Sequence, residues 1–311
     1  MNESLKGVLA MIAACAIWGL SSLYYKLLEQ VPPLEVLSHR TLWSALFFGI
    51  VLAFQGRLGQ VPALLGGRRV LLVTLAALCI SANWFMFILS IQIGHAMQAS
   101  LGYYIFPLVA VVLGIVAFGE RPNAAQAVAV TLALLAVVVL TWGLGVTPWI
   151  SLTIAVTFGF YGLLKKRLDA GPVVSVTAEV LVLSPIALVW LAGLQIGAWP
   201  GQPPAHFTLS DPRTAALLAL SGILTGGPLV LFSYAARRVN MATVGLIQYV
   251  NPTLQFLIAT FIFAEPFTPW HLAAFALIWA ALVIYSVATV ARDRAVRRAS
   301  TRLSTSGISP T

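Results

Sequence analysis

The chain is dominated by apolar runs of the length that a helix needs to cross a lipid bilayer. One of them, QASLGYYIFPLVAVVLGIVAFGE, occupies residues 98–120, and a spanning helix needs about 20 apolar residues. Hydrophobic residues make up 60% of the 311 positions and charged residues only 9%, against about 25% charged residues in soluble domains. The mean hydropathy is +0.94. A soluble fold is excluded, because it would expose apolar surface everywhere, and the sequence predicts an all-α integral membrane protein.

Turn residues and charges divide the apolar sequence into ten predicted transmembrane helices. Asn123 with Gln126 is typical of a capping box, and Thr268 followed by Pro269 is a second helix-start signal. The ten predicted helices cover residues 5–28, 34–54, 70–92, 96–118, 123–142, 146–164, 172–194, 213–236, 241–263 and 267–290.

The distribution of Lys and Arg predicts the orientation of these helices in the membrane. If the N-terminus is cytoplasmic, most of the 18 basic residues fall on the cytoplasmic side, while Lys26 and Arg213 lie outside and Arg40 lies within a helix. The positive-inside rule therefore predicts a multi-pass protein with both termini in the cytoplasm. The net charge of +9 is then a topology signal and an attraction to anionic lipid, rather than a nucleic-acid site. Residues 291–311 are expected to form a basic, disordered cytoplasmic tail.

The chain also contains an internal repeat. The stretch TVGLIQYVNPTLQFLIATFIFAE (243–265) follows the design of residues 98–120, and in both a proline precedes a glutamate by 13 residues: Pro107 and Glu120, Pro252 and Glu265. Earlier helices repeat at an offset of 140 residues, where Gly19, Leu23, Lys26, Leu28, Pro32 and Val36 match Gly159, Leu163, Lys166, Leu168, Pro172 and Val176.

Each repeat holds five helices, so the second repeat is expected to lie upside down relative to the first. The predicted repeats are residues 5–142 and 146–290. Inverted repeats are the architecture of secondary transporters, whose solute site lies at the repeat interface near the bilayer midplane. The sequence therefore predicts a transporter that works by alternating access, with a small solute and the lipid bilayer as its partners.

Three stretches also resemble one family. KGVLAMIAACAIWGLSSLYYKLLEQVPPLEVLSHRTLWS, QASLGYYIFPLVAVVLGIVAFGE and GLIQYVNPTLQFLIATFIFAEPFT are similar to the EamA-type permeases of the drug/metabolite transporter superfamily, and most similar to their RarD (chloramphenicol-sensitive protein) group. The resemblance covers about residues 5–290 and implies a ten-helix permease of the bacterial inner membrane, commonly an exporter. The sequence departs from that pattern at Phe106, where Asn is expected before the proline; Asn251 keeps the pattern in the second repeat.

The two prolines indicate where the solute path lies. A proline inside a helix frees the carbonyl four residues back, here those of Tyr103 and Gln248, and a free carbonyl in a membrane needs protein or water beside it. Residues at i, i+3 and i+7 share a helix face. One repeat thus presents aromatic groups and the other amides, which favours a small amphipathic or aromatic solute; the alternative is that these groups only pack helices together. The candidate path residues here are Tyr103, Phe106, Gln248, Asn251 and Gln255, with Pro107 and Pro252 as helix kinks.

Ionisable residues inside a membrane are rare and are functional-site candidates by default. The sequence contains His39, Arg40 and Glu179 within predicted helices, and His39 corresponds to Glu179 at the 140-residue offset. His39 or Glu179 could carry a coupling proton. Arg40 could instead lock helices together by pairing with a carboxylate or a carbonyl, and His39 could be a satisfied interior polar group.

Further polar and aromatic residues are weaker candidates for the path, because Trp and Tyr also anchor helices at membrane interfaces. They are Trp18, Tyr24, Asn83, Trp84, Gln98 and Tyr161. The sequence holds nine acidic residues in no metal-binding or catalytic pattern, so no cofactor, metal or enzymatic activity is expected. The alternatives to a permease are an integral-membrane enzyme and a membrane subunit that transports nothing.

Overall fold

The computed structural model describes residues 3–119, 123–239 and 241–305, and every regular element in that part of the chain is helical. Glu120 therefore lies outside the described residues. The elements are α1 (Glu3–Lys26), α2 (Pro33–Phe54), η1 (Leu58–Gln60), η2 (Pro62–Leu64), α3 (Gly67–Gln92), α4 (Ala96–Phe118), α5 (Ala124–Leu144), α6 (Trp149–Lys165), α7 (Pro172–Gln195), α8 (Pro212–Ala236), α9 (Met241–Gln248), α10 (Val250–Leu257), η3 (Ile258–Ile262) and α11 (Pro269–Thr305).

Eight of the described helices are long and apolar enough to cross a membrane, and α6 is a shorter apolar helix. The predicted start signals are confirmed. Asn123 and Gln126 form a reciprocal capping box at the start of α5, with the Gln126 amide donating to Asn123 Oδ1 at 2.8 Å, and α11 begins at Pro269.

The predicted ninth helix is divided into three pieces, which corrects the expectation of one continuous helix over residues 241–263. The helix is interrupted at Tyr249, between α9 and α10, and a π-helical turn, η3, follows. Pro252 has no backbone N–H, so it cannot continue the ladder through the interruption. The Thr253 amide and its hydroxyl both donate to the Tyr249 carbonyl, at 3.1 and 2.6 Å.

The predicted tail is also corrected. α11 does not end near residue 290 but continues as a helix to Thr305, where a disordered segment was expected. The segment ARDRAVRRASTRLST is rich in Ala and Arg and has neither Gly nor Pro. Because Ala and Arg are strong helix formers, the helix extends beyond its apolar part.

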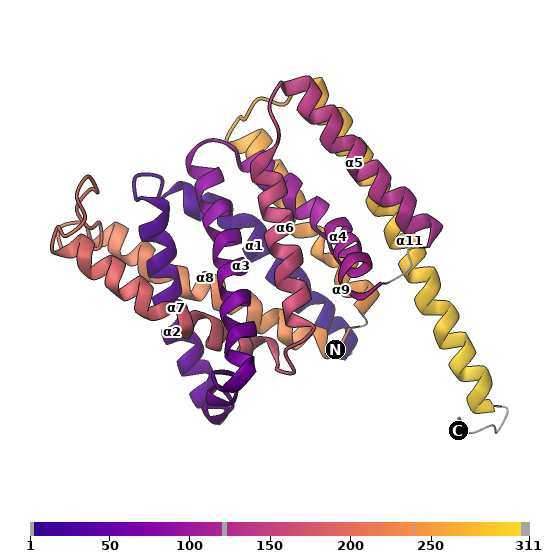
Figure 1. Ribbon diagram of the computed structural model, residues 1–311, viewed down its shortest axis with the longest axis horizontal. Coiled ribbons are helices and arrows are strands. Elements are labelled where there is room, and N and C mark those ends of the chain that lie inside the picture. Colours follow the sequence, from indigo (N-terminus) through magenta and orange to yellow (C-terminus); the bar gives the residue numbers. More distant parts are fainter. Residues whose placement is uncertain (1–2, 120–122, 240, 306–311) are drawn as a thin grey trace.

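The two halves of the bundle pack in a reciprocal pattern. α1 packs on α8 and α6 packs on α3, while α2 lies against α7 and α5 against α11. Figure 1 shows α5 and α11 side by side at one edge of the molecule. α4 also packs on α6, so every helix of the first half contacts a helix of the second half, in agreement with the repeat expected from the sequence.

Two glycines show the same relation at the level of single contacts. A Cβ added at Gly19 in α1 would lie 2.7 Å from Leu254 Cβ in α10, and a Cβ added at Gly159 in α6 would lie 3.1 Å from Val109 Cγ1 in α4. Gly19 and Gly159 are 140 residues apart, and Val109 and Leu254 are 145 residues apart, which are the two offsets of the repeat. Small residues thus allow the equivalent helix pairs to approach closely.

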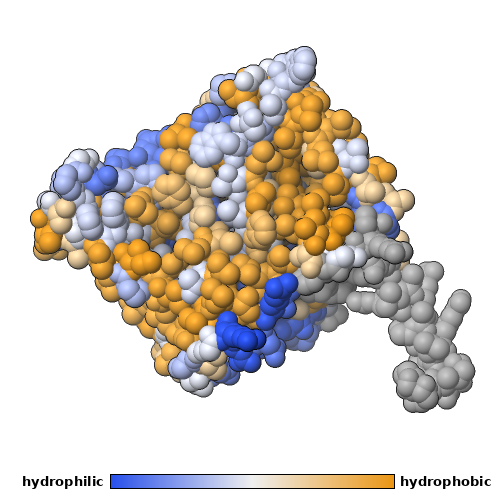
Figure 2. Space-filling model, in the orientation of Figure 1, coloured by the Kyte–Doolittle hydropathy of each residue, from blue (hydrophilic) through white to orange (hydrophobic). Residues whose placement is uncertain are grey.

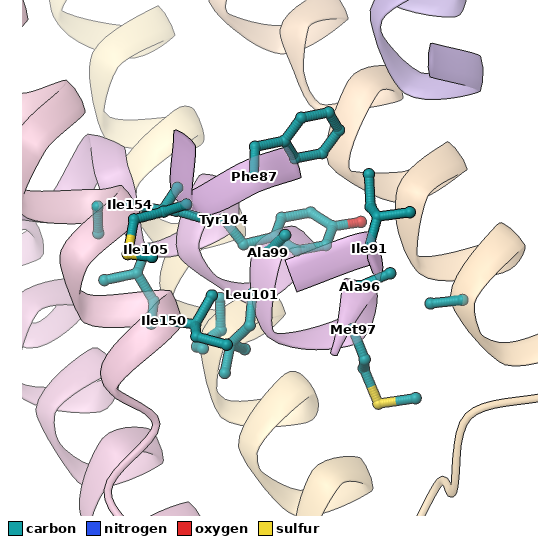
Figure 3. Packing of buried hydrophobic residues seen from close by; sticks show 14 of the residues in the cluster. Phe87, Ile91, Ala96, Met97, Ala99, Leu101, Tyr104, Ile105, Ile150 and Ile154 are labelled. Carbon is teal, nitrogen blue, oxygen red and sulfur yellow. The ribbon is translucent and has the colours of Figure 1, made fainter. Parts of the chain in front are cut away.

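Apolar packing joins the helices, and apolar side chains also cover the outside. In Figure 3, Ile105 of α4 lies close to Ile150 and Ile154 of α6 within the largest buried cluster. On the exterior, Trp142 is 83% exposed, and Figure 2 shows hydrophobic residues over most of the visible face, with hydrophilic ones mainly toward its edges. Such an extensive apolar exterior is the surface of a protein that is surrounded by lipid.

A half-buried carboxylate connects the end of one repeat to the other. Both carboxylate oxygens of Glu265 accept backbone amides at the start of α4, from Ala96 at 2.6 Å and Met97 at 2.8 Å. These amides have no partner within the helix. Glu265, which follows η3, therefore caps a helix of the first repeat, which explains a glutamate at the end of an apolar run. Burial raises the pKa of Glu265, and the two amides partly offset the rise.

Candidate solute-binding cavity

A cavity of about 570 Å³ lies between the two halves of the bundle. Helices of both halves line it, among them α1, α3 and α4 from the first half and α6, α8 and α10 from the second. The volume falls in the range of about 300–1,000 Å³ that is common for small-molecule sites. The cavity is thus large enough for a small solute and lies at the predicted repeat interface.

One wall of the cavity is aromatic and centres on Phe158 of α6. Its ring centroid lies 4.7 Å from that of Phe106 and 5.9 Å from that of Tyr103, both of α4. Tyr161 stacks on it at 5.9 Å with an interplanar angle of 11°. Phe106, the departure from the expected Asn, therefore contributes an apolar ring to this wall.

A hydrogen-bond chain crosses the same region and joins three helices. The Tyr103 hydroxyl donates to Asn83 Oδ1 at 2.8 Å, and Asn83 Nδ2 donates to the Ile154 carbonyl at 2.9 Å. Asn83 is 1% exposed, so its bonds hold α3, α4 and α6 together beside the cavity. Asn83 therefore lines the cavity and also joins helices.

Arg40 of α2 places a buried cation on the cavity wall. Its side chain donates from Nη1 to the Tyr25 hydroxyl at 2.8 Å, and the guanidinium carbon lies 4.0 Å from the centroid of the Trp84 ring. The sequence left open a carboxylate or a carbonyl as the partner of Arg40, and in the structure the partner is a phenol hydroxyl from α1. The residue is 5% exposed and Nε has no hydrogen-bond partner.

Lys165, at the end of α6, is the second cation on the wall, and it is paired. Its ammonium lies 2.6 Å from Glu179 Oε1 of α7 and contacts Ser175 Oγ, and the Tyr161 hydroxyl donates to Glu179 Oε2 at 3.1 Å. Glu179 is 1% exposed and does not itself line the cavity, whereas Lys165 and Tyr161 do. The Glu179 carboxylate therefore contacts two side chains of the cavity wall and is not itself part of that wall.

The three amides of α9 and α10 lie on the cavity wall. Gln248, Asn251 and Gln255 all line it, as do both prolines, Pro107 and Pro252. Gln255 Nε2 donates to Asn251 Oδ1 at 2.9 Å, whereas the Gln255 Oε1 atom is buried without a partner. The amide face and the aromatic face thus enclose one space.

Besides Glu179, three candidates do not line the cavity: Tyr24, Gln98 and His39. The Tyr24 hydroxyl donates to the Leu217 carbonyl at 2.6 Å, and the Gln98 carbonyl accepts from Ser151. His39 stacks on Phe207, with ring centroids 4.9 Å apart. Of the two candidate proton carriers, Glu179 contacts side chains of the cavity wall, whereas the stacking partner of His39, Phe207, does not line the cavity.

Sequence reasoning missed several lining residues, and the repeat offers a signal that would have found one of them, Phe158. Trp18 lines the cavity, and so does Phe158, its counterpart at the 140-residue offset. Tyr25 and Lys165 are related by the same offset and both line the cavity. Phe232, which lies against Trp18 with ring centroids 6.2 Å apart, has no such signal.

Comparison with known proteins agrees with this architecture. The EamA-like transporter family matches residues 5–142 and again residues 147–287, close to the two predicted repeats. The chain belongs to the EamA-like transporter family. It is a multi-pass transporter of a bacterial membrane, and within the EamA family its relatives place it in the RarD group.

The relatives match almost the whole chain. This EamA transporter is 42% identical to Protein RarD of Streptomyces exfoliatus, over 94% of this chain and 93% of the relative. It is 39% identical to the uncharacterized transporter YojE of Bacillus subtilis, over 94% and 97%, and 34% identical to Protein RarD of Escherichia coli, over 94% and 98%. A crystal structure with 17% identity and a TM-score of 0.60 covers 90% of this chain and 96% of its own, and supports the fold.

Proposed function

We propose that this EamA-family transporter moves a small amphipathic solute out of the cell by alternating access, with both termini in the cytoplasm. The observation that carries the proposal is the cavity between the halves, which combines an aromatic wall with buried polar atoms that have no partner, Arg40 Nε and Gln255 Oε1. A site that is largely apolar with a few polar groups is suited to an amphipathic ligand.

The alternating-access part rests on two equivalent contacts beside the cavity. Tyr25 at the end of α1 bonds Arg40 in α2, and Lys165 at the end of α6 pairs with Glu179 in α7. At the 140-residue offset Tyr25 corresponds to Lys165, and Glu179 corresponds to His39, which directly precedes Arg40. The two contacts therefore occupy nearly matching places in the two repeats. In the inverted arrangement one lies toward each side of the membrane, where loosening of one and then the other would open the cavity alternately.

Glu179 is the residue that we propose for proton coupling. It is buried, and it is hydrogen-bonded to two side chains of the cavity wall, so a change in its protonation would alter that wall. Intramembrane carboxylates serve as proton relays in other transporters. His39, in contrast, is separated from the cavity.

The test is solute exchange in proteoliposomes that contain the full-length chain, with and without a pH gradient. A panel of amino acids, metabolites and drugs should include a solute whose movement needs the protein. If no solute of the panel moves, the transport proposal fails. For coupling, Glu179→Gln should abolish the response to the pH gradient and His39→Gln should not; retention of the response in Glu179→Gln would refute the proton role.

A further inference from the structure

The two cations on the cavity wall, Lys165 and Arg40, differ in whether a carboxylate lies beside them. Lys165 is matched by Glu179 at 2.6 Å. Arg40 has a phenol hydroxyl and an indole ring as neighbours, and no carboxylate of the described residues lies within 4.0 Å of it. Among the described residues that line the cavity, Arg40 is therefore the cation without a counter-charge.

An unmatched charge at this depth calls for compensation. Arg40 is 5% exposed, and a buried charge is costly unless it is paired and hydrogen-bonded. Its contacts with Tyr25 and Trp84 orient the guanidinium, and its Nε donor is buried without a hydrogen-bond partner. Arginine binds carboxylates through two parallel N–H donors, of which Nε is commonly one. Arg40 is thus a residue of the cavity wall whose guanidinium is held in place and keeps one buried donor unpaired.

We propose that the transported solute is a small aromatic or apolar molecule with one negative charge, such as a carboxylate, and that Arg40 binds this charge. The inference rests on the proposed transport function. A single cation balances one negative charge, so a dianion would leave excess charge in a low-dielectric site. The aromatic wall of Phe106, Phe158 and Tyr161 then takes the apolar body.

Calorimetric binding to the purified full-length protein at neutral pH tests the inference with three related probes. 3-Phenylpropionate carries one negative charge, 3-phenylpropionamide is its neutral isostere, and phenylmalonate carries two charges. The wild type should bind the monoanion at least about tenfold more tightly than the amide, because a hydrogen bond to a charged group contributes enough for about 10–100-fold in affinity. The dianion should bind more weakly than the monoanion.

Variants separate the role of Arg40 from a general effect of charge. Arg40→Gln should weaken binding of 3-phenylpropionate about 10–100-fold and leave binding of the amide unchanged, and Arg40→Lys should keep part of the preference. Arg213→Gln is the matched control, since Arg213 is exposed at the start of α8 and does not line the cavity.

Several results would overturn the inference. They are equal binding of acid and amide by the wild type, no binding of the acid, tighter binding of the dianion, or an unchanged preference in Arg40→Gln. The comparison of probes on the wild type needs no variant, so it holds if Arg40→Gln fails to fold. Liposome exchange decides the transport proposal separately: neutral solutes that move without any anion preference would refute the role of Arg40 and leave transport intact.

Discussion

Replacement of Gly19 by alanine tests the close approach of α1 and α10, which form part of the cavity wall. The added Cβ would lie 2.7 Å from Leu254 Cβ and 3.1 Å from the Asn251 carbonyl oxygen. Carbon atoms in contact are about 3.5–4.0 Å apart, so the helices must separate by about 1 Å. Overpacking of this kind costs about 1–3 kcal/mol, and a glycine-to-alanine change within a helix recovers about 0.5–1 kcal/mol. The expected net loss is about 0.5–2 kcal/mol.

Two other glycines supply the matched controls. At Gly159, the repeat counterpart, the nearest atoms are Leu113 Cδ1 at 3.0 Å and Val109 Cγ1 at 3.1 Å, which are side-chain ends that can rotate away. At Gly162, in the same helix, no atom lies within 4 Å of an added Cβ. The expected order of stability is therefore Gly162→Ala, then Gly159→Ala, then Gly19→Ala.

Thermal unfolding in one detergent, followed by circular dichroism, measures this order. For a chain of this size 1 kcal/mol shifts the Tm by about 2 °C, so Gly19→Ala should lower it by about 1–4 °C, and Gly162→Ala should leave it unchanged or raise it. If Gly19→Ala is as stable as Gly162→Ala, the close approach of α1 and α10 is not a constraint and the reasoning is wrong.

Three further predictions concern the helix cap and the aromatic wall. Because burial raises the pKa of Glu265 above its ordinary value of 4.5, its contribution to stability is full below that value and is lost as the pH rises through the raised pKa. Glu265→Gln should remove this part of the pH dependence of the Tm; parallel Tm–pH curves for variant and wild type would contradict it. Phe106→Asn removes a ring 4.7 Å from Phe158 and should weaken calorimetric binding of 3-phenylpropionate about 2–10-fold, as expected for about 0.5–1.5 kcal/mol of ring–ring contact; unchanged affinity would exclude Phe106 from the site. Tyr103→Phe leaves Asn83 Oδ1 without its donor and should lower stability by about 1–2 kcal/mol, whereas a Tm equal to wild type would show that the bond adds nothing.

Much of the fold followed from local signals in the sequence. Hydropathy and turn residues located the helices, and the Asn123 capping box depends on residues three positions apart, within the range that sequence spacing determines. The end of α11 was missed, because an apolar criterion marks the part suited to the membrane and not where a helix of Ala and Arg stops.

The repeat in the sequence indicates some of the residues that line the cavity, but not the contacts that they make. It related Trp18 to Phe158 and Tyr25 to Lys165, which all line the cavity. It did not predict that Lys165 is paired while Arg40 contacts Tyr25, because those contacts depend on side-chain chemistry that differs between the two halves.

The sequence by itself determined that the chain has membrane-spanning helices, where most of them lie and that its two halves repeat, since hydropathy, turn residues and offsets are properties of the chain. Only the tertiary structure decided which side chains meet. Tyr24 bonds a backbone carbonyl of α8 while Tyr25 reaches Arg40, and His39 stacks on Phe207 while Arg40 lines the cavity. Neighbouring residues on a helix point about 100° apart, and the packing of the other helices determines which direction faces the cavity.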